Sequence, residues 1–430
     1  MSEYLIKSET LQDIANALRE KTGETGTFKV QDFATEIREI EGGGGDIDGL
    51  IDGTLTEVTS NATSIRDYAF QNYSTLLTAN FPKATAIGQY AFYGNTVLKN
   101  IDFANVTTIG KNAFQNCDAL KTANFPNVTS IENSAFFGCN GLNRVYFPNA
   151  TSIGNYAFSG CNDYHFSSVD FPSATSIGNS AFSNCSRLET ANFPNVTTIG
   201  DNAFIYCSNL INVNFPKLES IGEQAFAGCP FTTIDLPNVT TIADEGLQSL
   251  DFVQSIDLPK ATTIGQSGLA GCRKMLTANI PLITTLQSST FSGCYKLQTA
   301  NLPNVTSVGG SAFSSNYSLT KVIIGTNTET APTLSSTNAF SGCYHITGTV
   351  NATYNPEGLK DGYIYVKADK VAETRTKTNW VTYATQIMPW VATVEELSNI
   401  DGTTYDHACV GEGVNSVEYI YNGTAWEVFR

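Results

Sequence analysis

One segment of about 22 residues recurs along most of this 430-residue chain. An aliphatic residue marks each copy: Ile65, Ile87, Ile109, Ile131, Ile153, Ile177, Ile199, Ile221, Ile242, Ile264, Leu286 and Val308. Successive markers are 22 residues apart, except for one interval of 24 and one of 21, and five residues after each comes Phe or Leu. Since one copy can bury its apolar face only against neighbouring copies, this period predicts a solenoid rather than a single globular core.

The apolar spacing inside one copy predicts its local structure. One such copy carries apolar residues at Leu120, Ala123, Phe125, Val128 and Ile131. Ala123 and Phe125 alternate with polar residues, which predicts a short strand with both side chains on one face. The Ala-Phe-x-x-Cys half has a spacing of three to four, which predicts a turn of α-helix or 3₁₀ helix. We therefore expect each copy to form one coil, with Phe stacked on Phe and Ile on Ile.

The pattern Asn/Thr-x-Ile-Gly-x-x-Ala-Phe-x-x-Cys, with Phe-Pro or Leu-Pro after the strand, resembles the BspA-like (Treponema-type) leucine-rich repeat. The resemblance covers roughly residues 55–345. It implies an α+β repeat solenoid, to which the flanking sequences add a helical N-terminal module and a small β-containing C-terminal unit. It does not specify one function.

The flanking segments predict the domain organisation. Residues 1–41 contain two amphipathic stretches, the first capped by Ser8, and predict a helical attachment or oligomerisation module. Its apolar surface is small, so we expect it to pack on a partner or on a copy of itself. Residues 42–50 form a Gly-rich linker, 51–345 the solenoid and 346–390 its C-terminal cap. Residues 391–430 form a β-rich unit, whose Asn422-Gly423 predicts a hairpin.

Charge and hydropathy exclude several classes of function. The formal net charge of −16, with dispersed Lys and Arg, excludes nucleic-acid binding through backbone phosphates. No apolar run approaches the roughly 18 residues needed to span a bilayer, so we expect no membrane insertion. The opening residues lack the basic start and apolar core of a signal peptide.

The cysteines and histidines predict no catalytic or metal site. Nine of the ten cysteines lie three residues after the repeat Phe or Leu, in a slot that Asn, Tyr or Leu fills in other copies, so we interpret them as a reduced packing column. Cys409 lies near His407 outside the array and is a weak candidate nucleophile. No pair among the three histidines has metal-ligand spacing. We expect no enzyme activity, metal or cofactor; an enzyme that uses the C-terminal unit is the least favoured alternative.

The first residues carry a second resemblance. The segment Tyr-Leu-Ile-Lys-Ser-Glu-Thr-Leu-x-x-Ile-Ala-x-Ala-Leu-Arg-x-Lys-Thr-Gly resembles the start of tail-associated proteins of phages and prophages of Gram-positive bacteria. This implies a non-enzymatic receptor-binding protein in the virion tail, joined to a tail or baseplate protein through residues 1–41. Its partner would be a host cell-surface protein or glycan. The alternative is a bacterial cell-surface adhesin of the BspA type, located on the cell surface.

A polar column and one irregular coil supply the candidate ligand-binding residues. The column occupies the outward strand position at Asn80, Asp102, Asn124, Asp170, Asn192, Asn214, Asp235, Asp257, Asn279 and Asn301. It is either an amide ladder that links neighbouring coils or a face that binds a glycan or protein. Tyr146 interrupts it beside Arg144, and the 24-residue interval adds residues around Asp163, Tyr164 and His165. This composition is typical of binding hot spots, and the alternative is drift in a tolerant array.

Overall fold

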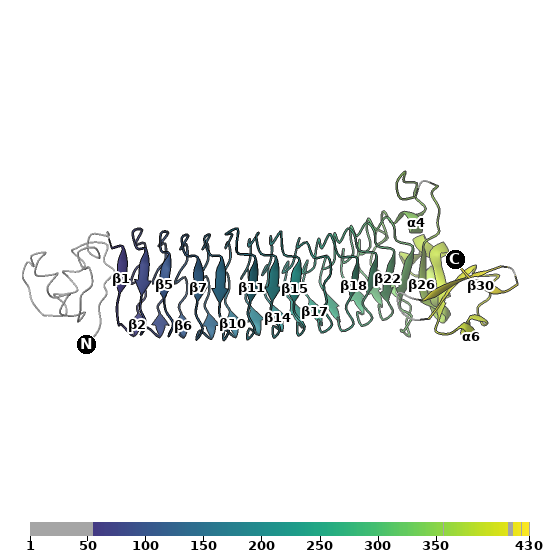
Figure 1. The fold of residues 1–430 in the computed structure, drawn as a ribbon. Helices are drawn as coiled ribbons and strands as arrows, with labels where there is room; N and C mark the ends of the chain where they lie inside the picture. Colours follow the sequence, from purple (N-terminus) through teal and green to yellow (C-terminus); the bar gives the residue numbers. More distant parts are fainter. Residues whose placement is uncertain (1–54, 356, 412–415, 423, 430) are drawn as a thin grey trace, which may run out of the picture. The chain divides into compact units, whose positions relative to one another are not determined.

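The computed structural model describes residues 55–355, 357–411, 416–422 and 424–429 (Figure 1). The predicted helical module at 1–41 and the linker at 42–50 lie outside these residues. The chain divides into two compact units, Met1–Pro194 and Asn195–Arg430.

In the first unit, each coil contributes one longer and one shorter strand. The longer strands are β1 (Glu57–Thr59), β3 (Thr78–Asn80), β5 (Asn100–Asp102), β7 (Thr122–Asn124), β9 (Arg144–Tyr146), β11 (Ser168–Asp170) and β13 (Thr190–Asn192). The shorter are β2 (Ser64–Ile65), β4 (Ala86–Ile87), β6 (Thr108–Ile109), β8 (Ser130–Ile131), β10 (Ser152–Ile153) and β12 (Ser176–Ile177). The pairs are parallel and in register, with Ala79 opposite Ile101 and Ile87 opposite Ile109. The predicted solenoid is confirmed.

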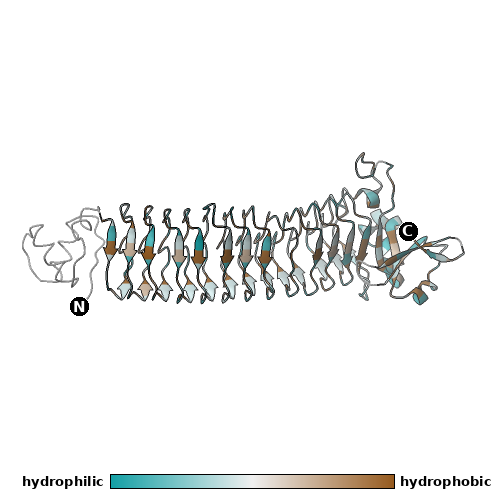
Figure 2. Ribbon diagram, in the orientation of Figure 1, coloured by the Kyte–Doolittle hydropathy of each residue, from teal (hydrophilic) through white to brown (hydrophobic). Residues whose placement is uncertain are grey.

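Equivalent side chains of successive coils stack inside the solenoid. Phe92 and Phe114 have ring centroids 5.3 Å apart and planes 4° from parallel, and Phe114 stacks in the same way on Phe136 at 5.2 Å. A second column runs through Phe103 and Phe125 at 6.1 Å. These rings are buried, so every coil depends on its neighbours for most of its core. Figure 2 shows apolar residues (brown) recurring along the strands.

The Ala-Phe-x-x-Cys half of the coil is not helical, and this prediction was wrong. Asn112 and Asn116 both have a left-handed backbone, with φ 58° and 59°. A left-handed residue at every fourth position breaks any helical path. The N–H of Gln115 bonds within its coil to the carbonyl of Asn112, but the N–H of Phe114 donates to Ala135 of the next coil at 2.8 Å. The segment is a series of turns that hydrogen bond to the neighbouring coil.

The cysteine column packs beneath these turns. All ten cysteines are free and buried, which confirms the packing role predicted for the nine cysteines of the repeat. Cys117 Sγ donates to the Phe92 carbonyl at 3.1 Å, and Cys139 Sγ donates to that of Phe114 at 3.0 Å. Burial raises the pKa of Cys139 to about 12, so the thiol stays protonated. It therefore packs as a small, mostly apolar side chain that donates one weak hydrogen bond.

The second unit repeats the pattern and ends in a nine-stranded sheet. Its shorter strands are β14 (Thr198–Ile199), β16 (Ser220–Ile221), β17 (Thr241–Ile242), β19 (Thr263–Ile264), β21 (Thr285–Leu286), β23 (Ser307–Val308) and β25 (Thr333–Leu334), and β15 (Asn212–Asn214) is the first longer one. The large sheet runs in the order β18 (Ser255–Asp257), β20 (Thr277–Asn279), β22 (Thr299–Leu302), β24 (Lys321–Ile324), β26 (Tyr363–Lys367), β27 (Ile387–Val391), β28 (His407–Val410), β29 (Val417–Tyr421) and β30 (Trp426–Val428). Its pairs are parallel up to β28, whereas β28, β29 and β30 are antiparallel, which confirms the predicted hairpin. The sheet continues through the predicted boundary at residue 391, where β27 ends.

Short helices connect the last strands, and one of them, η2, covers the end of the phenylalanine column. They are α4 (Tyr344–Thr347), η1 (Ala368–Lys370), α5 (Val371–Thr376), η2 (Trp380–Gln386) and α6 (Val394–Leu397). Phe340 stacks on Phe313 at 5.1 Å, and its other side meets Tyr383 of η2 edge-on at the same distance. Buried Trp380 donates through Nε1 to the Pro332 carbonyl at 2.9 Å. Within the described ranges, no helix has the length and apolar character to cross a bilayer.

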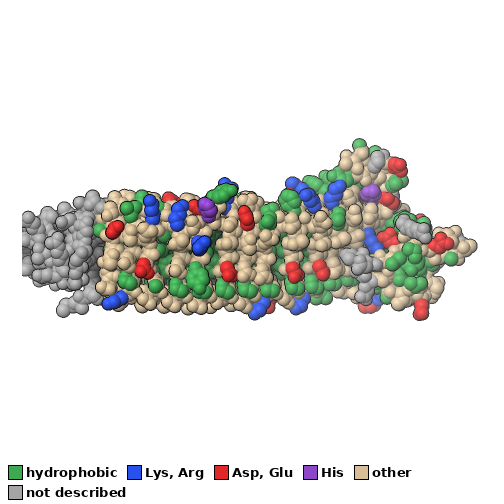
Figure 3. Space-filling view, in the orientation of Figure 1, with side chains coloured by type: hydrophobic (Ala, Val, Ile, Leu, Met, Phe, Trp, Pro, Cys, Tyr) green, Lys and Arg blue, Asp and Glu red, His purple; other side chains and the backbone are tan. Residues whose placement is uncertain are grey.

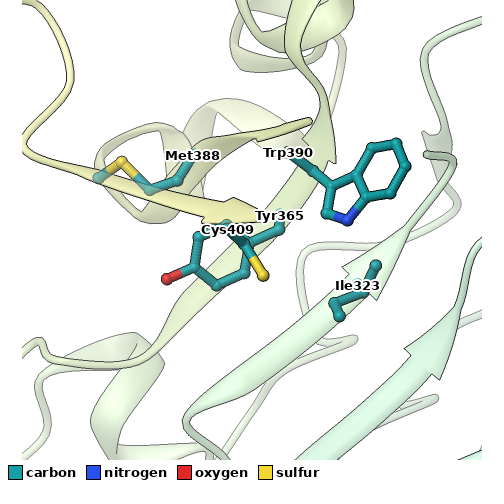
Figure 4. Close-up of a cluster of buried hydrophobic side chains, with 5 residues drawn as sticks. All are labelled: Ile323, Tyr365, Met388, Trp390 and Cys409. Carbon is teal, nitrogen blue, oxygen red and sulfur yellow. The ribbon is translucent and has the colours of Figure 1, made fainter. Parts of the chain in front are cut away.

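The last strands also bury the outward face of the sheet. Ile323, Tyr365, Met388, Trp390 and Cys409 form one buried apolar cluster (Figure 4). Lys321, next to this cluster on β24, is itself buried and donates through Nζ to the Ser416 carbonyl at 2.7 Å. The C-terminal strands therefore cover the polar side of the preceding coils.

Candidate functional site

The outward face of the first unit carries the predicted polar column. The parallel register places Asn124 beside Tyr146 and Asp170 beside Asn192. Asn192 Nδ2 donates to Asp170 Oδ1 at 2.7 Å, so hydrogen bonds of the predicted ladder do link neighbouring coils. Asn124 and Asp170 are exposed, which leaves further donors and acceptors open to solvent. In Figure 3 the charged side chains are scattered over a largely uncharged surface.

Arg144 and Tyr146 lie on the same side of β9, because residues two apart on a strand share a face. Both are exposed, Tyr146 by 54%, and Val145 between them is turned inward. The tyrosine replaces an amide in the column and so interrupts the ladder beside Asn124. The result is an aromatic ring and a guanidinium side by side on a polar surface.

Asp163 organises the loop before β11, in the coil that has two extra residues. Its Oδ1 accepts the backbone N–H of His165 at 2.9 Å, and its Oδ2 pairs with Lys121 Nζ at 3.0 Å. The pKa of Asp163 is lowered, first by the His165 backbone hydrogen bond and then by Lys121 and the His165 side chain. The carboxylate is therefore held in its charged form.

Tyr164 is the most exposed large side chain of this loop, with 74% of its surface accessible. The guanidinium carbon of Arg187 lies 5.4 Å from its ring centroid, a cation–π distance. His165 meets the same ring edge-on, with centroids 5.7 Å apart. Arg187 and Lys121 are functional candidates that the sequence analysis missed; only the 24-residue interval indicated that this loop reaches across other coils.

Lys121 joins the two groups of predicted residues. Its carbonyl accepts the N–H of Arg144 at 3.2 Å, while its ammonium pairs with Asp163. We call Lys121, Arg144, Tyr146, Asp163, Tyr164, His165 and Arg187 the recognition cluster. Asp170 and Asn192 form their own hydrogen-bonded pair on the two coils that follow Tyr146, and Asn124 borders the cluster. The cluster exposes cations and aromatic rings at the surface, and its one carboxylate, Asp163, is paired with Lys121.

Cys409 is poorly placed to be a nucleophile. Its Sγ is fully buried and donates to Ser416 Oγ at 3.2 Å. Burial raises its pKa, which keeps the less reactive thiol form. His407 is also buried and stacks on Tyr363, with ring centroids 4.3 Å apart. In the described part of the chain, no three His, Cys, Asp or Glu side chains form a group that could hold a metal ion.

Comparisons with known proteins identify the repeat. The family model "BspA type Leucine rich repeat region (6 copies)" matches residues 54–165, 141–252 and 219–347. A leucine-rich repeat protein from Bacteroides ovatus ATCC 8483 has the same fold, with TM-score 0.54 and 21% identity over 68% of this chain and 85% of that chain. A leucine rich cell surface protein from Faecalibacterium prausnitzii A2-165 aligns with TM-score 0.44 and 26% identity over 67% and 86%. The pneumococcal vaccine antigen PcpA aligns with TM-score 0.36 and 17% identity over 74% and 76%.

No curated protein matches the sequence. The three matched segments overlap and together span more than half of the chain. The chain therefore belongs to the BspA-type leucine-rich-repeat family.

Proposed function

We propose that this chain is a non-enzymatic recognition protein whose first unit binds a cell-surface protein or glycan. The observation that carries the proposal is the recognition cluster, whose exposed side chains include two tyrosines, two arginines and a lysine. Tyr and Arg are the residue types most often responsible for binding energy at interfaces. The repeat fold presents them on a rigid support, because each coil is hydrogen bonded to the next.

The finer proposal is a tail-associated protein of a phage or prophage, and it depends on the resemblance of residues 1–41. In this proposal that segment attaches the chain to a tail or baseplate protein, and the repeats face the host cell. Mass spectrometry of purified particles tests it directly, since the protein should be a stoichiometric component. Detection only on the surface of the producing cells, with none in particles, would favour the adhesin alternative instead.

Binding of the labelled full chain to intact host cells tests the recognition role. We expect the double variant Arg144→Ala/Tyr146→Ala to bind about 30-fold or more weakly, because hot-spot truncations cost about 2 kcal/mol or more. Tyr156→Ala is the matched control, since Tyr156 is an exposed tyrosine (47%) of the same unit outside the cluster. Equal binding by all three proteins would remove this surface from the proposal.

A further inference from the structure

A row of tyrosines lies along the turns of the second unit, between the shorter strand of one coil and the longer strand of the next. Tyr295, Tyr317 and Tyr344 each follow the buried cysteine slot of their coil, so the repeat brings them into one column. Their rings are stacked, with centroids 4.8 Å apart for the first pair and 5.1 Å for the second. All three side chains are half-buried, and we call them the tyrosine row.

The stacking leaves the outer edges of these rings, rather than their faces, for contact with a ligand. Each face inside the row is covered by the next ring, whose plane is within 15° of parallel. In the described part of the chain, none of the three hydroxyls has a hydrogen-bond partner, and none is among the enclosed polar atoms that lack one. The row therefore presents one solvated hydroxyl per coil.

Exposed cations border the tyrosine row. Arg273 occupies the same slot one coil earlier, and its guanidinium carbon lies 6.0 Å from the Tyr295 ring centroid. Lys296 Nζ lies 5.5 Å from the ring centroid of Tyr354, which itself packs on Tyr317 at 4.8 Å. Figure 3 shows Lys and Arg side chains (blue) gathered along the upper edge of the molecule over β18 to β22. Aromatic contacts thus hold cations beside the row.

Lys274 and Lys296 occupy one slot on successive coils, where like charges repel each other. Among the described residues neither ammonium has an acidic partner, and Lys274 Nζ instead lies 4.4 Å from the ring centroid of exposed Phe252. Arg273 has one, Asp251, at 3.4 Å. This surface therefore has a surplus of positive charge in a chain whose net charge is −16. A bound anion would relieve the repulsion between the two lysines.

We infer that the tyrosine row, with Arg273, Lys274 and Lys296, binds an acidic glycan that runs along the coils. The carboxylate or sulfate groups of the glycan pair with the two lysines, and its hydroxyls hydrogen bond to the tyrosine hydroxyls. A pyranose in an extended chain advances by close to one coil spacing per residue, so successive sugars meet equivalent side chains. This surface is in the second unit and is additional to the recognition cluster.

Two other kinds of polyanion fit the surface less well. Single-stranded nucleic acids bind by stacking bases on free aromatic faces, whereas the faces inside the row cover one another. An extended acidic peptide places the side chains of one face about 6.8 Å apart. The rings of the row repeat at 4.8 and 5.1 Å, so a peptide falls out of register after one or two side chains.

Affinity electrophoresis of the full chain through gels that contain a polysaccharide tests the inference. The probes are polygalacturonate, which carries carboxylates, dextran sulfate, which carries sulfates, and neutral dextran. We expect at least one acidic probe to retard the chain, less so with added salt, and neutral dextran to have no effect. Because the net charge of −16 opposes binding of any polyanion, retardation reports a local positive surface.

Lys274→Gln/Lys296→Gln removes both unpaired charges and should weaken binding about fivefold, since exposed ion pairs are individually weak. The matched control Lys217→Gln/Lys260→Gln removes the same charge from exposed lysines of the same unit, in the loops that precede β16 and β19, and should bind as the native chain does. Tyr317→Phe keeps the ring stack and removes one hydroxyl. It should bind about threefold more weakly with unchanged thermal stability.

The inference is overturned if neither acidic polysaccharide retards the chain, or if the two double lysine variants behave alike. Tighter binding of polyglutamate than of both polysaccharides would replace the glycan by an acidic peptide. Normal binding by Tyr317→Phe would mean that charge alone attracts the polymer, which also overturns the glycan assignment. Cell attachment without binding of either acidic polysaccharide would leave the proposed function intact, and retardation without cell attachment would leave only this surface.

Discussion

The same strand column has different surroundings in the two units. In the first unit, Asp170 and Asn192 hydrogen bond to each other and Asp170 remains exposed. In the second, the equivalent ladder continues through Asn279 to the buried Asn301. The residue type and the spacing are the same, so the repeat itself does not cause the difference.

The difference comes from the C-terminal strands that succeed the array. A ladder of amides is satisfied only while the next coil supplies another polar residue in the same slot. In the second unit, the same position on the next two strands holds Ile323 and then Tyr365, and both are buried with Trp390. Asn301 therefore has no polar neighbour on the next strand of the column, and it lines a cavity of about 280 Å³ together with Ile323 and Trp390.

The largest difference in stability between the two units should come from removing Trp390, which covers the buried end of the amide ladder. Trp390→Ala deletes a buried ring from the cluster and should destabilise the second unit by about 3–5 kcal/mol. Tyr146→Ala removes an exposed ring from the first unit and should change stability by less than about 0.5 kcal/mol. Because repeat arrays unfold in parts, hydrogen exchange read separately for each unit is the appropriate measurement. Similar effects of both changes would mean that Trp390 does not cover the ladder.

Inside the solenoid, substitutions in the cysteine column should have the same effect on stability in both units. The polar column on the outer face should respond differently in the two units. Asn95 in the first unit and Asn316 in the second occupy the cysteine slot, fully buried, with no described partner for either side-chain polar atom. Asn95→Cys and Asn316→Cys should each stabilise their unit by about 1–3 kcal/mol, the cost of a buried unsatisfied amide. Thermal and urea denaturation would measure this. Destabilisation by either change would show that the slot has a polar partner.

The sequence predicted the features that depend on the period and missed those that depend on neighbours outside it. The Phe and Ile columns and the reduced cysteines follow from equal spacing, because each coil repeats the contacts of the one before. The Ala-Phe-x-x-Cys turns were mistaken for a helix because the spacing of three to four between their apolar residues fits both structures. Hydrogen bonds to the next coil, which a sequence does not display, decide between the two.

The candidate sites show the same limit. The exposed residues Arg144, Tyr146 and Tyr164 could be found as departures from the repeat. Lys121 could not, since it pairs with Asp163 across 42 residues only because one coil is longer. The sequence analysis also could not predict the cavity lined by Asn301 and Trp390, because these residues meet only through the folding of the chain between them.

A small effect is predicted for Asp163, and it tests whether the first unit needs the Asp163–Lys121 ion pair. Asp163→Asn should lower stability by only about 0.2–1 kcal/mol, since Lys121 is exposed. The pKa of Asp163 is lowered in the folded chain, so its contribution is complete above the unfolded pKa of about 3.9. It should disappear as the pH falls through the lower folded pKa, and added salt should reduce it at neutral pH. Urea denaturation of both proteins between pH 2 and 7 is the measurement, and a difference that persisted at the lowest pH would mean that the asparagine perturbs the loop rather than the charge.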